Sequence, residues 1–184
     1  MAIAAGLALA LGAGVFIGSN SASRQGAEDL AEMRDEIRSL RSTVALALLA
    51  EQSPSERLNG VAYGRELQTE DRRVADALFT TLLEDPNVNV RLAALDALRE
   101  VSSRPETRTR LLESIPAQDS PLVQISAIDV LLEASTPASG TSSPAASTRE
   151  DVAGRADLAR LAENPDLDEV VRGYLRDRLE RSPR

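Results

Sequence analysis

The side chains of this chain that could do chemistry are carboxylates and arginines, because its 184 residues include no histidine and no cysteine. That composition excludes zinc sites of the usual kind, thiol nucleophiles and histidine-based acid and base catalysis. The densest carboxylate groups are Glu84-Asp85, Glu150-Asp151 and Asp166 with Asp168 and Glu169. The last group lacks the glycine and the twelfth-position glutamate of a calcium loop. We therefore expect no catalytic residue, no cofactor and no metal site.

These carboxylates lie where helices are expected to begin or end. Acidic side chains in the first turn of a helix interact favourably with its dipole, by about 0.3 to 1 kcal/mol each. We interpret the acidic groups as helix caps, and the chain as a protein that is not an enzyme.

The overall composition favours closely packed helices and argues against nucleic-acid binding. Hydrophobic residues make up 42% of the chain but aromatic residues only 2%, so the core must consist of Leu, Ala, Val and Ile. Strands would favour aromatic and β-branched residues. The net charge is -8, and no arginine cluster has interleaved aromatic residues. Such a surface repels phosphate backbones and offers no base-stacking platform.

A repeated segment indicates helix hairpins. The segment RLAALDAL at 91–98 recurs as QISAIDVL at 124–131, and weaker copies begin at Arg57 and Arg172. Each copy follows another apolar-periodic helix and a short turn, and such hairpins bury their apolar faces only by stacking. The predicted pairs are 35–51 with 54–67, 71–84 with 87–101, 105–115 with 120–134, and 149–163 with 166–181.

The pattern resembles HEAT repeats, in which an acidic turn residue lies six positions before an Arg or Lys that follows a Val. Asp85 with Arg91 and Asp166 with Arg172 match this pattern, whereas Gln124 replaces the basic residue in the third unit. The resemblance implies an all-α fold, a short right-handed α-solenoid of about four HEAT-like hairpins. It also implies that Asp85, Arg91, Asp166 and Arg172 are structural residues of a ladder between neighbouring repeats.

The N-terminal segment 1–18 is expected to be a transmembrane helix or signal anchor. Residues 2–18 carry no charge, and as a helix they would span about 26 Å of a hydrocarbon core of about 30 Å. A cleaved secretory signal is the alternative. Small residues recur every four positions and would let two such helices approach closely as a homodimer; they are Gly6, Ala10, Gly14 and Gly18.

A juxtamembrane stalk is expected at 19–34, and an apolar seam runs from Leu30 to Ala47 in steps of three and four. In a parallel pair of such helices, Asp29 and Glu36 would face Arg34 and Arg41 of the second copy. This seam therefore predicts a second homodimer contact. A single helix that lays the stripe on its own domain is an equally open alternative.

The remaining boundaries follow from composition. Segment 35–134 holds the first three hairpins, and 149–181 holds the last. Between them, residues 135–148 consist almost entirely of Ser, Thr, Ala, Pro and Gly, so they cannot bury apolar area. We expect a flexible loop there.

The stretch from Glu36 to Leu132 is similar to the extracytoplasmic HEAT region of bacterial membrane proteins that often begin with a zinc-finger anti-sigma module. That module's Cys and His ligands are missing from this sequence. The resemblance implies a single-pass protein of the bacterial inner membrane with a periplasmic repeat domain, although Arg24 favours the opposite orientation.

We therefore expect a non-enzymatic scaffold that binds a protein partner, and the alternative is an anti-sigma-like signalling regulator without its zinc finger. The possible protein-binding residues are outward positions of the second helix of each hairpin, namely Arg57, Asp96, Arg99 and Asp129. Asp96 and Asp129 could instead pair with an arginine of a neighbouring unit.

Overall fold

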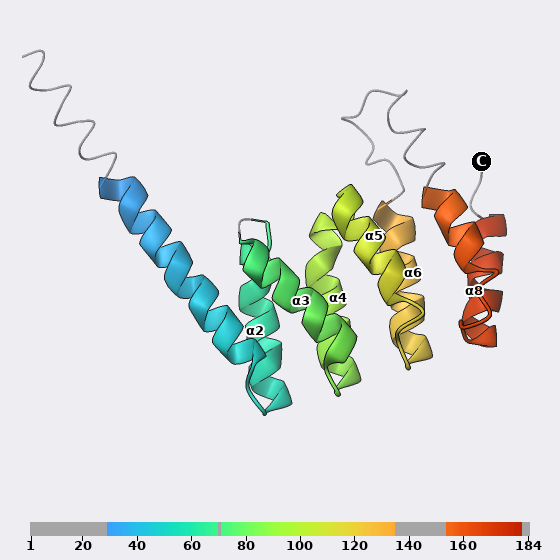
Figure 1. Cartoon of the computed structure of the whole chain (residues 1–184), viewed down its shortest axis with the longest axis horizontal. Helices are drawn as coiled ribbons and strands as arrows, with labels where there is room; N and C mark the ends of the chain where they lie inside the picture. Colours follow the sequence, from blue (N-terminus) through green and yellow to red (C-terminus); the bar gives the residue numbers. More distant parts are fainter. Residues whose placement is uncertain (1–28, 70, 135–153, 182–184) are drawn as a thin grey trace, which may run out of the picture. The chain divides into compact units, whose positions relative to one another are not determined.

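The computed structural model describes residues 29–69, 71–134 and 154–181, and all regular secondary structure within these ranges is helical (Figure 1). The all-α prediction is thereby confirmed. The apolar segment 1–18, its Gly6 to Gly18 face and the loop 135–148 lie outside the described residues. In the described ranges, no helix combines the length and the apolar character that crossing a bilayer requires.

Most helices match the predicted segments closely, but the boundary predicted between 34 and 35 falls inside one continuous helix. Residues 29–49 and 154–161 are helical, and the labelled helices are α2 (Pro54–Leu67), α3 (Arg72–Glu84), α4 (Val88–Leu98) followed by the 3-10 turn η1 (Arg99–Val101), α5 (Pro105–Ser114), α6 (Pro121–Ala134) and α8 (Glu169–Arg181).

The chain divides into two compact units, Met1–Arg41 and Ser42–Arg184. The described part of the first unit is helical, and every residue from 29 to 41 is exposed. The second unit contains the packed helices.

Successive hairpins pack on one another through the second unit. Helix α4 contacts both α2 and α3, α6 contacts α4 and α5, and α8 contacts α6 (Figure 1). The second helices of the hairpins, α2, α4, α6 and α8, thus form a continuous row. The interior between the helices is aliphatic, and its fully buried large side chains include Leu78, Leu82, Leu95, Leu98, Leu111, Ile115, Ile128, Leu131, Leu158 and Leu175.

Side-chain caps set where several helices begin. The Asn87 carboxamide oxygen accepts hydrogen bonds from the backbone nitrogens of Asn89 and Val90 at the start of α4. Asp168 accepts from the Val170 nitrogen, 2.8 Å away, at the start of α8. Asp85, expected as a cap, is used differently: Asn87 caps α4, and the Asp85 carboxylate binds an arginine of the preceding hairpin.

Asp71 caps α3 and gives the fold a dependence on acid pH. Hydrogen bonding from the Arg73 side chain lowers the pKa of Asp71 from 3.8 to about 2, and its carboxylate also accepts from the Arg73 backbone nitrogen at 2.9 Å. The folded state therefore gains stability above the ordinary pKa of an aspartate. That stability is lost as pH falls through the lowered value.

We expect the free energy of unfolding to decrease less in Asp71→Asn than in the parent as the pH falls from about 4 to about 2. The difference between the two losses should be about 1 kcal/mol at most, because the Arg73 side chain is exposed. Asparagine keeps the capping acceptor and removes the charge. Urea unfolding followed by circular dichroism at a series of pH values measures the difference. Parallel curves for the two proteins would contradict this assignment.

Candidate functional site

Arg57 and Asp85 form a buried ion pair that joins the first hairpin to the second. Arg57 Nε lies 2.6 Å from Asp85 Oδ2, and Nη2 lies 2.9 Å from Oδ1. The two side chains are 11% and 4% exposed. Hydrogen bonding to Asp85 raises the pKa of Arg57, so the guanidinium stays charged. Arg57, expected among the outward binding residues, is instead buried and used within the stack.

The second rung repeats the first. Arg91 Nη2 lies 2.7 Å from Asp119 Oδ1, at the same separation of 28 residues that joins Arg57 to Asp85. Arg91 is buried, but the Asp119 side chain is 82% exposed. Each arginine therefore binds the acidic turn residue of the following hairpin. Asp85 and Arg91, which lie six positions apart, bind different partners and not each other.

The ladder stops at the third hairpin. Gln124 occupies the arginine position and donates to the carbonyls of Ile115 and Gln118, 3.2 and 2.9 Å away. It has no charge to offer the next hairpin, where Asp166 is exposed. Arg172 is half-buried, and its Nε has no hydrogen-bond partner in the described structure. No ion pair joins Asp166 to Arg172 within the described ranges.

Restoring the missing rung should stabilise the fold. We expect Gln124→Arg to raise the free energy of unfolding by about 1 kcal/mol at most, because its guanidinium would pair with the exposed Asp166 as Arg91 pairs with the exposed Asp119. Thermal unfolding of the variant, alone and combined with Asp166→Asn, is the measurement. The gain should vanish in the combination, and a gain that persists there would contradict the proposed rung.

Exposed charges on the row of second helices form a strip that we call the B strip, defined by Arg65, Asp96, Arg99 and Glu133. Asp96 pairs with Arg65 of the preceding hairpin, and Arg99 Nε lies 3.2 Å from Asp96 Oδ1. Arg99 also pairs with Glu133 of the following hairpin. Two of the predicted binding residues, Asp96 and Arg99, are thus brought together.

Asp129 lies one helical turn before Glu133 on α6 and binds residues of α8. The Tyr174 hydroxyl donates to Asp129 Oδ1 at 2.6 Å, and Arg178 Nη2 lies 3.2 Å from the same oxygen. Burial raises the pKa of Tyr174, and the hydrogen bond to Asp129 adds to the effect, so the hydroxyl stays protonated. Asp96 and Asp129 therefore both pair with arginines of neighbouring units, which is one of the possibilities that the sequence left open.

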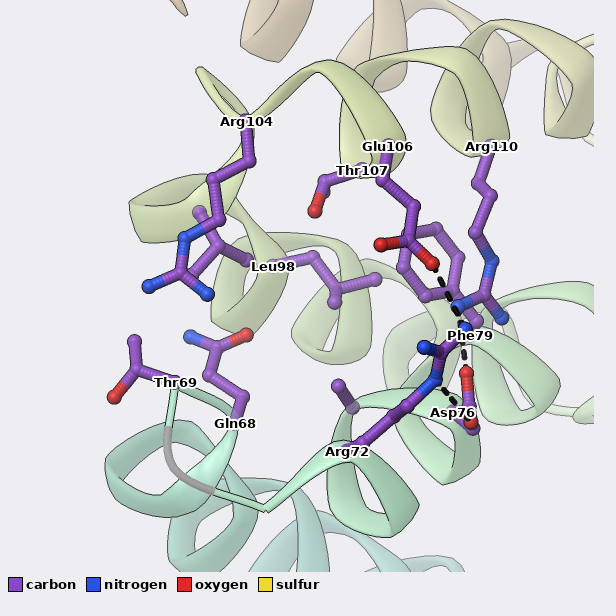
Figure 2. A pocket seen from close by; sticks show the side chains of 12 residues that line it. Gln68, Thr69, Arg72, Asp76, Phe79, Leu98, Arg104, Glu106, Thr107 and Arg110 are labelled. Atoms are coloured by element: carbon purple, nitrogen blue, oxygen red, sulfur yellow. Dashed lines mark hydrogen bonds and ion pairs between the residues drawn. The ribbon is translucent and has the colours of Figure 1, made fainter.

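A hollow of about 290 Å³ is formed where α3, α5 and the ends of α2 and α4 come together (Figure 2). It is lined by Gln68, Thr69, Arg72, Ala75, Asp76, Phe79, Leu98, Val101, Arg104, Glu106, Thr107 and Arg110. Leu98, which lines the hollow, directly precedes Arg99 of the B strip in the chain.

On one wall of the hollow, each charged side chain pairs with one of opposite charge. Arg72 lies 3.0 Å from Glu106 Oε1, and Arg110 lies 2.6 Å from Asp76 Oδ1. The Arg110 guanidinium also stacks over Phe79, 3.8 Å from the ring centroid. Figure 2 shows these side chains grouped on one side of the hollow, each charge facing an opposite one. This wall therefore has little charge left for a ligand.

Arg104 lies on the other side of the hollow. Its guanidinium extends toward Gln68 and Thr69, away from these ion pairs (Figure 2). None of the other lining residues forms an ion pair with it. Gln68 is 4% exposed, its Nε2 donates to the Ala97 carbonyl, and its Oε1 lacks a partner among the described residues. The hollow thus offers the guanidinium of Arg104, with which no other lining residue forms an ion pair.

Sequence reasoning missed this hollow. Its lining comes from the end of α2, from α3, from the end of α4 with η1, and from α5, so no local spacing connects Gln68 with Arg104 or Phe79. The available signal was Arg104-Pro105, which marks a helix start and carries no ligand information.

The arrangement offers binding groups. Arginine and carboxylate side chains dominate it, and among the described residues no group of acidic residues could hold a metal ion. No protein-family model matches the chain, and no curated protein matches it significantly.

Proposed function

We propose that the chain is a non-enzymatic protein-binding scaffold, built as a short right-handed α-solenoid of HEAT-like hairpins. The two arginine-to-acid rungs support this architecture, since they connect consecutive hairpins at one constant separation. The row of second helices, in which each member contacts the next, supports it as well.

The proposed contact surface consists of the hollow and the B strip. Its main support is the exposed guanidinium of Arg104. This exposed cation stands in a hollow whose other charges are already paired. Concave sites with mixed apolar and polar lining are where proteins usually bind ligands. The partner protein is expected to place an acidic side chain against Arg104.

The strip contributes recognition more than affinity. Its side chains are about half exposed, and exposed ion pairs are worth at most about 1 kcal/mol. Replacing them with ion pairs to a partner therefore costs little free energy. Asp96 and Arg99 remain the proposed contact residues from the sequence analysis, and Asp129 extends the same row toward α8.

Cross-linking tests this surface. A photoreactive amino acid in place of Thr69, which lines the hollow, should form a discrete adduct in cells of the source organism. The same group in place of Thr80, an exposed residue of α3 outside the hollow, should not form it.

Charge reversal provides the matched control. Arg104→Glu should abolish the Thr69 adduct, whereas Arg160→Glu makes the same charge change on an exposed arginine in the last hairpin and should leave it intact. An adduct that survives Arg104→Glu, or that forms equally from Thr80, contradicts the proposed surface.

We also propose that residues 2–18 tether the scaffold to the inner membrane of a bacterium, with the repeat domain in the periplasm. The uncharged segment of suitable length supports the anchor, and the resemblance to extracytoplasmic HEAT regions supports the orientation. Fractionation of a chain tagged at both ends should recover both tags in the membrane. Loss of the N-terminal tag with a soluble C-terminal tag would indicate a cleaved signal instead.

A further inference from the structure

The helix at 29–49 has an apolar stripe that is open to solvent. Its members alternate in steps of three and four residues and are between 47% and 60% exposed; they are Leu30, Met33, Ile37, Leu40 and Val44. They make up half of the large hydrophobic side chains that are exposed in the described ranges. Exposed apolar stripes of this kind mark interaction surfaces.

The three- and four-residue steps of the stripe indicate what kind of partner would cover it. Steps of three and four average 3.5 residues, which keeps the stripe on one side of a helix that winds around a second helix. The stripe is also narrow, as in the seam of a coiled coil, and a broader stripe would be needed to enter a globular core. The occupant is therefore another helix with a matching seam.

The charges beside the stripe identify that helix as a second copy. Asp29 and Glu36 flank the seam on one side, and Arg34 and Arg41 flank it on the other. The structure pairs none of these four with another described residue, whereas Arg38 and Asp35, on the outer face, pair with each other at 2.6 Å. The flanking charges remain available for a neighbour.

We infer that two copies of this chain associate in parallel and in register through residues 29–44. In that arrangement Asp29 of each copy faces Arg34 of the other, and Glu36 faces Arg41. An antiparallel pair would bring the two acidic flanks together and the two arginine flanks together. Like charges repel, so the sequence selects one direction as well as one partner. This inference is independent of the partner bound at the hollow.

The absence of native cysteine makes the seam easy to test in the full chain. Leu40→Cys, at the seam, should form a disulfide-linked dimer under mild oxidation, because equivalent seam positions face each other in a parallel pair. Asp35→Cys lies on the opposite side of the helix and serves as the matched control, with little or no dimer. Equal cross-linking of the two variants would overturn the inference.

Mixing experiments test direction and charge. A chain with Leu30→Cys mixed with a tagged chain carrying Leu40→Cys should give disulfides between like chains and few between unlike chains. Predominant unlike disulfides would show antiparallel pairing and overturn the inference. The double variant Arg34→Glu with Arg41→Glu should lose the Leu40→Cys dimer by at least about tenfold, the equivalent of about 1.4 kcal/mol.

A complementary variant keeps the inference falsifiable if the charge variant simply aggregates or loses structure. Mixing it with a chain that carries Asp29→Arg and Glu36→Arg should restore a mixed dimer with opposite charges facing each other. Both variants should retain the parent's circular dichroism, because the exchanged side chains are exposed. If the charge variant dimerises as well alone as it does with the complementary chain, for example through residues 2–18 only, the inference is overturned.

Discussion

Asp85→Ala is expected to lower the free energy of unfolding by about 3 to 5 kcal/mol, because it leaves a buried arginine without its counter-charge. The carboxylate is 4% exposed and binds both Nε and Nη2 of Arg57. It also accepts from the Asn87 backbone nitrogen at 2.8 Å, which orders the turn before α4. Urea unfolding monitored by helical circular dichroism measures the loss.

The second rung supplies the matched control. Asp119→Ala removes the same kind of partner from Arg91, but the Asp119 side chain is 82% exposed, so water replaces it. We expect a cost of about 1 kcal/mol or less. In addition, Arg57→Met combined with Asp85→Ala should cost less than the two single changes together, since the pair acts as a unit. Equal losses for Asp85→Ala and Asp119→Ala would contradict this account.

Gly60→Ala is expected to destabilise the first hairpin by about 1 to 3 kcal/mol, the usual cost of overpacking. A Cβ at this position would lie 2.6 Å from the Leu49 nitrogen and 2.9 Å from the Leu48 carbonyl carbon. These are backbone atoms and cannot rotate away, so α2 would have to separate from the helix at 29–49. The melting temperature of the variant reports the effect.

Gly173→Ala is the control for the same chemical change. Apart from its chain neighbours and the nearby backbone of its own helix, no atom lies within 4 Å of the position of its Cβ, and the residue is within α8. Alanine there should stabilise the protein by about 0.5 to 1 kcal/mol through its better helix propensity. The two substitutions should therefore shift the melting temperature in opposite directions, and a rise in both would contradict the close approach at Gly60.

Helix positions were predictable because the signals for them are local. Apolar periodicity, prolines in first turns and capping residues lie within a few positions of the helix ends that they determine. The predicted ranges 54–67 and 71–84, for example, correspond to α2 and α3 within one residue. Asp168 was likewise interpreted as a cap and is one.

Partner identity was less predictable. The spacing of six residues singled out Asp85 and Arg91, yet their bonds run to Arg57 and Asp119 in the neighbouring hairpins. The stacking of the hairpins also buries Arg57, although the sequence pattern had placed it at an outward position of its helix. Residues far apart in sequence meet only after the leucines between hairpins have packed and set the offset from one hairpin to the next.

The sequence by itself determined that this protein is helical, that its interior is aliphatic, and that histidine and cysteine chemistry is closed to it. Those properties depend on composition and on contacts within one or two helical turns. The tertiary structure decided which charged side chains bind one another between hairpins and which, such as Arg104, stay open at the surface. That choice depends on distances between segments about 30 residues apart, which helix packing sets and local spacing does not encode.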